Sequence, residues 1–280
     1  MIELGKYHEL KVIRKVDFGV YLQAGDDSIL LPIKYVPKNT KLGDSIRVFV
    51  YKDSEDRIIA TTLEPYATVG DFALLKVTDV NATGAFLDWG IAKDLFVPFR
   101  EQNKKMETGK KYMVYIYIDE ETERITASAR INRFIEKEEI DLKEDDIVEL
   151  LIAQKTDMGF NAIINNKYWG LLFKNEIFTE IAIGHKVRGY IKQIREDKKI
   201  DLTLQKRGAE LIDHSKWQIL KALEQNEGFL ALGDQSSPDE IYRTLNMSKK
   251  TYKKSIGNLY KEKLIQITEN GIKLLKKKSN

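Results

Sequence analysis

The most constraining feature of the sequence is an internal repeat that covers its first three quarters. Each of three segments starts with a glycine or an aspartate and has a glycine 14 residues later. Another glycine follows after 24 or 25 residues, and an isoleucine after a further 15 or 16. In chain order these landmarks are Gly5, Gly19, Gly43 and Ile58; Gly70, Gly84, Gly109 and Ile125; and Asp145, Gly159, Gly184 and Ile200. The chain therefore contains three related modules of about 65–75 residues.

Each module has the residue pattern of short β-strands. The runs at 45–51, 111–118 and 186–194 alternate in polarity and are rich in β-branched and aromatic residues, and a polar, turn-forming stretch follows each run. A module of this size cannot cover both faces of an open sheet, so five short strands closing into a small barrel is the expected fold. The second glycine of each module is expected at a tight turn with a positive φ angle.

The second module carries a family resemblance. Residues 70–77, 83–90 and 95–99 read GDFALLKV, TGAFLDWG and LFVPF, and residues 117–128 read YIDEETERITAS. These stretches resemble an S1 domain, the RNA-binding repeat of ribosomal small-subunit protein one. The match is good over residues 65–134 and looser over 1–64 and 140–207. The resemblance implies an oligonucleotide-binding barrel that stacks exposed bases on aromatic side chains.

Carried over to this chain, the resemblance implies a set of RNA contacts on the middle strands. In the third module Asn161 stands at the position of Phe86, so its contacts are expected from nearby residues instead. The expected contacts are Phe18 and Tyr21 in the first module, Phe86, Trp89 and Phe96 in the second, and Phe160, Tyr168, Phe173 and Lys192 in the third. The alternative is that these side chains belong to the barrel cores, as expected for Phe72 and Leu95.

From residue 213 the apolar period changes from two to about 3.6, which indicates helices. The pattern predicts helices over 214–225 and 238–245, a third helix from about Lys249, and a hairpin of 264–267 with 272–275. This order is that of a winged helix. In the third helix the face expected to pack inward holds Tyr252, Ile256, Leu259 and Tyr260. The opposite face is expected to bind RNA through Lys249, Lys250, Lys253, Lys254 and Lys261.

Charge and a second resemblance both bear on this last quarter. Residues 213–280 hold thirteen Lys and Arg against eight Asp and Glu, a net charge of +5, whereas residues 1–64 and 65–134 are each neutral. Such asymmetry favours a polyanionic partner for the C-terminal end. The stretches SSPDEI (236–241), NMSKK (246–250) and IGNLYKEKLI (256–265) resemble the conserved virulence factor B family of bacterial RNA-binding regulators. That resemblance implies RNA binding and post-transcriptional control of gene expression.

The expected architecture is mainly β with a C-terminal α+β domain. Three tandem five-stranded oligonucleotide-binding barrels at 1–64, 65–134 and 140–207 precede a winged helix at 213–280. We expect a non-catalytic protein without metal or cofactor, because His8, His185 and His214 lie in separate modules and cysteine is absent. Without a membrane-spanning stretch or a secretory signal, the expected location is the cytoplasm.

The expected partner is single-stranded RNA, with messenger RNA as the first candidate, ahead of duplex DNA. The third barrel and the winged helix, which hold the excess positive charge, are expected to form one RNA track. Two alternatives remain open at this point. The winged helix could belong to a DNA-binding transcriptional regulator, or the chain could be a protein-interaction adaptor for the ribosome or the RNA-decay machinery.

Overall fold

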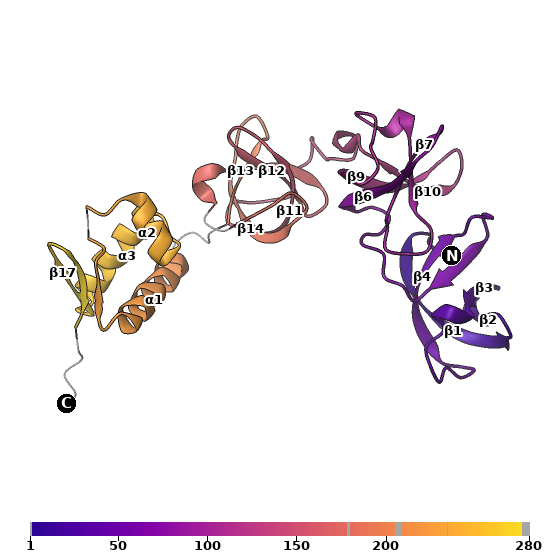
Figure 1. The fold of residues 1–280 in the computed structure, drawn as a ribbon, viewed down its shortest axis with the longest axis horizontal. Helices are drawn as coiled ribbons and strands as arrows, with labels where there is room; N and C mark the ends of the chain where they lie inside the picture. The colour runs from indigo at the N-terminus through magenta and orange to yellow at the C-terminus, as the bar shows by residue number, and fades with distance from the viewer. Residues whose placement is uncertain (1, 178–179, 205–208, 234, 276–280) are drawn as a thin grey trace. The chain divides into compact units, whose positions relative to one another are not determined.

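The computed structural model describes residues 2–177, 180–204, 209–233 and 235–275, with the side chains of 175 and 209–214 left out. Residues 205–207 and 276–280, inside the expected bounds of the last two domains, lie outside the described residues. The chain divides into two compact units, Met1–Glu136 and Lys137–Asn280. The first unit holds two closed five-stranded barrels, and the second holds a third barrel and a winged-helix domain (Figure 1). The expected fold class is thereby confirmed.

The three barrels share one topology. Barrel one consists of β1 (Lys6–Val16), β2 (Gly19–Ala24), β3 (Asp27–Pro32), β4 (Ser45–Lys52) and β5 (Ile58–Thr61). Barrel two consists of β6 (Phe72–Val80), β7 (Gly84–Leu87), β8 (Leu95–Pro98), β9 (Lys111–Asp119) and β10 (Arg124–Ser128). Barrel three consists of β11 (Ile147–Lys155), β12 (Gly159–Ile164), β13 (Tyr168–Phe173), β14 (Lys186–Ile194) and β15 (Ile200–Thr203). In each, the third strand runs parallel to the fifth and closes the barrel, and alternate residues fill the interior.

The second glycine of each module is required by close approach between strands. A Cβ atom at Gly19, Gly84 or Gly159 would lie 2.2, 2.3 or 2.0 Å from a carbonyl oxygen of the neighbouring strand. Gly84 does not have a positive φ, so the expectation of a shared positive-φ turn is wrong. At all three positions glycine is needed because the backbone of the neighbouring strand leaves no room for a Cβ atom at the start of the second strand.

Barrels one and two pack together through a common hydrophobic core. Phe49 and Tyr51, on the outer face of β4, join the cluster that contains Trp89 of barrel two. The rings of Phe49 and Trp89 meet edge to face with centroids 5.3 Å apart, and Trp89 Nε1 donates a 2.8 Å hydrogen bond to the carbonyl of Ala67. Burial raises the pKa of Tyr51 to about 12. The first unit is therefore one body made of two barrels.

A half-buried lysine adds polar contacts to this interface. Lys93 Nζ, on the loop between β7 and β8, donates hydrogen bonds of 2.9 and 2.7 Å to the carbonyls of Lys52 and Asp53 in barrel one. Burial lowers the pKa of Lys93 below its ordinary value. Arg124 of barrel two also pairs with Asp56 of barrel one. These contacts fix the orientation of the two barrels in addition to the apolar core.

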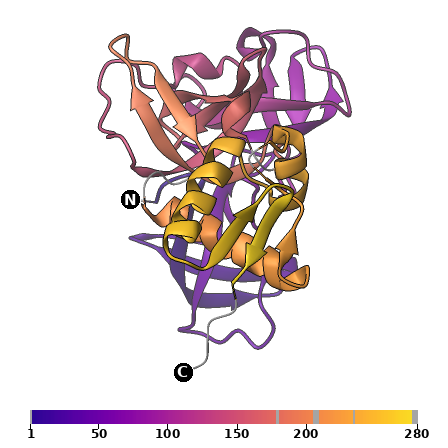
Figure 2. The same cartoon turned by 90° about the vertical axis from the view of Figure 1, so that its left-hand side faces the viewer.

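The C-terminal domain has the predicted winged-helix order with two differences. It contains α1 (Ala209–Gln225), β16 (Phe229–Leu230), α2 (Pro238–Leu245), α3 (Lys249–Lys261), β17 (Ile265–Thr268) and β18 (Gly271–Leu274). The first helix starts at residue 209 rather than 214, and the short strand β16 at the sheet edge was not predicted. Figure 2 shows the β17–β18 hairpin, in yellow, beside the helices.

Serine caps fix where the second and third helices of this domain begin. Ser237 accepts a hydrogen bond from the Glu240 backbone while the Glu240 side chain accepts one from the Ser237 backbone, a capping box. Ser248 caps α3 by accepting a hydrogen bond from the Thr251 backbone. Both helices therefore begin where the sequence predicts.

Candidate nucleic-acid interface

A row of side chains crosses the outer face of barrel two. In the strand register Phe86 pairs with Phe96, Phe96 with Thr126, and Thr126 with Tyr117. Paired residues in adjacent strands place their side chains on the same face of a sheet. The alternate residues Leu87, Leu95, Ile116 and Ala127 point inward and are buried. The fold thus aligns residues from four strands that are far apart in the sequence.

The aromatic members of this row make ring contacts and keep part of their surface accessible. Phe86 and Phe96 lie with centroids 5.2 Å apart and planes tilted by 40°. At the other end Phe134, which follows a short 3₁₀ turn, lies 5.4 Å from Tyr117 and stacks at 4.1 Å on Tyr115. Phe86, Phe96, Tyr117 and Phe134 are all half-buried. We call these four residues the aromatic row, because each presents a ring to the same outer surface.

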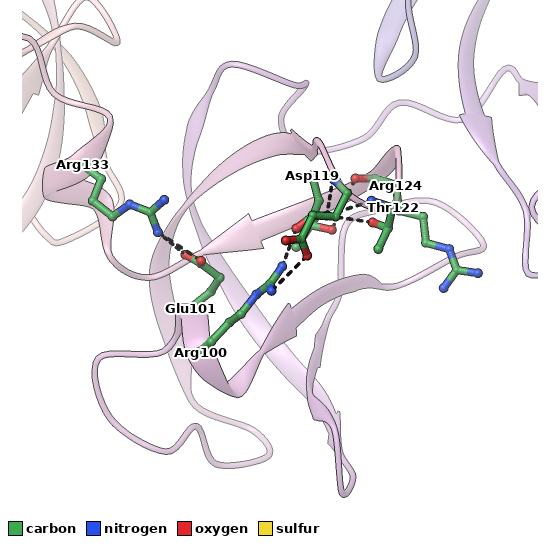
Figure 3. Close-up of polar contacts among 8 residues, drawn as sticks. Arg100, Glu101, Asp119, Thr122, Arg124 and Arg133 are labelled. Carbon is green, nitrogen blue, oxygen red and sulfur yellow. Dashed lines mark hydrogen bonds and ion pairs between the residues drawn. The ribbon is translucent and has the colours of Figure 1, made fainter.

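Two arginines lie beside the Tyr117 end of the aromatic row, around an open groove of about 480 Å³. Figure 3 shows their contacts with acidic side chains. Arg100 Nη2 lies 2.8 Å from Asp119 Oδ2, and Arg133 Nη1 lies 3.0 Å from Glu101 Oε1. Both carboxylates are buried and both guanidinium groups are exposed. A guanidinium has five N–H donors, so donors remain for a phosphate after these contacts. The buried carboxylates therefore hold two arginines in place without covering them.

The ionisation of Asp119 supports this arrangement. Burial alone would raise the pKa of this carboxyl, but hydrogen bonds donated by Thr122 and Arg100 lower it below its usual range. The carboxylate is therefore ionised at neutral pH and attracts the Arg100 guanidinium. Glu121, which is exposed, also contacts Arg100 at 3.3 Å. A bound anion would compete with Glu121 more easily than with buried Asp119.

Barrel one has a smaller exposed aromatic site. Phe18 is 57% exposed and meets Tyr21 edge to face at 6.5 Å, and the Arg14 guanidinium lies 4.1 Å above the Tyr21 ring. The register continues from Tyr21 through Leu30 and Ile59 to Tyr51. Because barrel two covers Tyr51, the row in barrel one has an accessible ring at one end only.

Barrel three lacks the aromatic row. Its equivalent positions pair Asn161 with Leu171, Leu171 with Asp201, and Asp201 with Gln193. The predicted residues Phe160 and Phe173 are half-buried beside this row, and Phe160 packs against the barrel core.

Two cationic side chains near the row of barrel three have acidic partners. The Arg195 guanidinium lies 5.8 Å from the Phe173 ring and pairs with Asp201 at 2.8 Å. Lys192, a predicted phosphate contact, forms an ion pair with Glu176. The RNA track expected on this barrel therefore stays a prediction.

Two predicted RNA contacts are wrong because their rings are buried. Trp89 is 2% exposed and lies in the interface between barrels one and two, where its indole N–H is already bonded. Tyr168 is also 2% exposed, and its hydroxyl bonds Asp141. Phe72 and Leu95 lie in the interior as expected. Neither Trp89 nor Tyr168 has a ring face available to a base.

The basic face of α3 is largely as predicted. Lys250, Lys253, Lys254 and Lys261 are exposed, and Lys249 is half-buried near Glu240. Tyr252, Ile256 and Leu259 pack inward. Tyr260 is 55% exposed, so its assignment to the packed face is wrong. It follows Ile256 by four residues, but it lies on the margin of the packed face, where solvent reaches it.

Five residues of the candidate interface were missed by sequence reasoning. The sequence contained a signal for Tyr115 and Tyr117, because they alternate in a strand with the apolar residues Val114 and Ile116, which are buried. Arg100, Arg133 and Phe134 had none, because they reach the groove through 3₁₀ turns outside the strand pattern.

The described residues were also compared with the requirements of a metal site and of a membrane-spanning helix. No group of three or more His, Asp or Glu side chains in that part of the chain is placed to hold a metal ion. His8 is half-buried and His185 is exposed, and the side chain of His214 lies outside the described residues. The described helices include none with the length and apolar character to cross a membrane.

Comparison with known proteins finds both kinds of domain. A family model described as S1 domain matches residues 4–63 and 69–129, and one described as CvfB-like winged helix domain matches residues 217–274. The chain is 27% identical to the uncharacterized protein YitL of Bacillus subtilis, over 95% of this chain and 92% of that protein. It is 26% identical to Conserved virulence factor B of Staphylococcus epidermidis, over 85% and 82% respectively.

One solved structure matches most of the chain. It is the crystal structure of a multidomain protein with nucleic acid binding domains from Streptococcus pneumoniae, which is 24% identical to this chain with a TM-score of 0.41. The alignment covers 97% of this chain and 98% of that one.

Proposed function

The chain belongs to the conserved virulence factor B family and carries S1 and winged helix domains, which are nucleic-acid-binding domains, and on this premise we propose that it binds single-stranded RNA without acting as an enzyme. In this proposal the chain consists of four binding domains, at residues 1–64, 65–134, 140–207 and 213–280. Its cellular target is messenger RNA in the cytoplasm, and its role is post-transcriptional regulation.

The observation that carries the proposal is the aromatic row beside the two arginines of barrel two. Half-buried rings on an open barrel face suit bases that are unstacked and splayed out, as in single strands. In a duplex the base faces are stacked on one another and are not accessible to such rings. Arg100 and Arg133 supply exposed cations beside the rings for the phosphate backbone.

Comparison of single-stranded RNA with duplex DNA tests this proposal against a DNA-binding regulator. We expect the purified chain to bind unstructured RNA more tightly than duplex DNA of equal length at the same salt concentration, because only the RNA offers bases for stacking. Fluorescence anisotropy with labelled oligonucleotides measures both affinities. A preference for the duplex would favour the transcriptional regulator, and the absence of salt-sensitive binding to either would favour the protein-interaction adaptor.

Substitution of Phe86 tests the aromatic row. Phe86→Ala is expected to weaken binding to unstructured RNA by on the order of tenfold, since each stacked base contributes about 1–3 kcal/mol. The matched control is Tyr66→Ala, which removes a ring that is 65% exposed in the same unit but outside the row. Anisotropy titrations give both affinities. Equal affinities for Phe86→Ala and the control would contradict the role of the row.

A further inference from the structure

Gly257 occupies a helix position that no contact among the described residues explains. It lies in the interior of α3, where glycine is among the least favourable residues. Its φ is not positive, and a Cβ at this position would meet no heavy atom within 4 Å beyond its own helix backbone. By contrast, Cβ atoms at Gly170 and Gly189 would lie 2.7 and 2.3 Å from core leucines. In the part of the chain that the structure describes, neither conformation nor packing therefore accounts for the missing side chain at Gly257.

The surroundings of Gly257 are cationic and aromatic. Residues three and four positions away on a helix are its surface neighbours. For Gly257 these are Lys253 and Lys254 on one side and Tyr260 and Lys261 on the other, and all four are exposed. A patch of bare helix backbone is thus surrounded by three ammonium groups and one phenol ring. From Lys253 to Lys261 the patch extends for about 12 Å along the helix axis.

We propose that the sugar-phosphate backbone of single-stranded RNA lies directly on Gly257. Without a Cβ, the strand approaches the helix closely enough for Lys253, Lys254 and Lys261 to reach successive phosphates, and the Tyr260 ring contacts a neighbouring ribose or base. The cost of a glycine in the helix is offset by these shorter ammonium–phosphate distances in the complex. This inference rests on the proposed RNA binding and assigns the contact point on the winged helix.

Substitution of Gly257 by alanine is expected to change the stability of the winged-helix domain and its RNA affinity in opposite directions. Gly257→Ala is expected to raise the melting temperature of the winged-helix domain, because alanine favours the helix and meets no obstruction. The same variant is expected to bind unstructured RNA about fivefold more weakly, because the methyl group holds the strand away from the helix. The control is Thr244→Ala in α2, which also favours the helix, is exposed, and has no lysine three or four residues away. Its RNA affinity is expected to equal that of the unchanged chain.

The outcomes distinguish this inference from the broader proposal. Calorimetry and RNA anisotropy on the full chain give the melting temperature and the affinity of each variant. If Gly257→Ala binds RNA as tightly as Thr244→Ala, the contact at Gly257 is refuted while RNA binding by the chain stands. If the unchanged chain binds no RNA, the proposed function itself is refuted, and the contact at Gly257 with it. If polyglutamate displaces RNA from the unchanged chain at equal charge concentration, the patch takes acidic peptide and the inference is overturned.

Discussion

Replacing Trp89 with alanine is expected to destabilise the two-barrel unit by about 3–5 kcal/mol, the usual cost of removing a large buried aromatic side chain. The indole fills the interface between the barrels, packs edge to face on Phe49 and bonds the carbonyl of Ala67. Alanine leaves a cavity there and an unpaired carbonyl. Because Phe49 and Tyr51 lie on the outer face of barrel one, they become exposed when the barrels separate.

Hydrogen exchange of the full chain measures this effect for each element. In Trp89→Ala, amide exchange is expected to accelerate in both β4 and the β7–β8 segment, since the two barrels lose a shared core. Tyr66→Ala removes an exposed ring next to the same interface and is expected to change the unfolding free energy by no more than about 0.5 kcal/mol. If Trp89→Ala exchanges like this control, the interface does not hold the barrels together. A loss of RNA affinity with unchanged exchange would restore Trp89 as a stacking residue.

The burial of Trp89 between the barrels shows what could not be predicted about these modules from the sequence. The spacing of the repeat was enough to predict three closed barrels, because glycines and alternating strands are local features. In a single isolated barrel Phe49 and Tyr51 would both be surface rings. They are buried because two modules pack together, and no local pattern encodes which faces of neighbouring modules meet. An aromatic residue in a repeat can therefore be predicted to lie on an outer face without being predicted to be accessible.

The candidate site was predictable to a similar extent. Phe86 and Phe96 lie on the outer face of barrel two as expected, and their binding role stays a prediction. Their continuation to Tyr117 depends on the parallel pairing of β8 with β10, which joins segments about 30 residues apart and has no signature in the sequence. In the winged helix the serine caps gave the starts of α2 and α3. The start of α1 was missed although Gly208 directly precedes it in the sequence, because the prediction began the helix at His214.

Removing four lysines from α3 is expected to cause the largest loss of RNA affinity. In the variant Lys249→Ala, Lys250→Ala, Lys253→Ala and Lys254→Ala, up to four phosphate contacts disappear. Each phosphate contact to a single strand contributes about 0.7 to the slope of log affinity against log salt, so the slope should fall by about 3. At physiological ionic strength this corresponds to a loss on the order of a hundredfold. The effect exceeds that expected for Phe86→Ala because it removes several contacts at once.

A charge-matched control makes this test specific to the basic face of α3. The control replaces Lys38, Lys41, Lys104 and Lys105, which are exposed but lie outside both the aromatic row and α3. Both variants lose four positive charges, so any difference between them reports the position of the lysines rather than the net charge of the chain. Anisotropy titrations at several salt concentrations give the affinity and the slope together. If the two variants have equal slopes, the winged helix attracts RNA only through long-range charge, and direct phosphate contacts on α3 are ruled out.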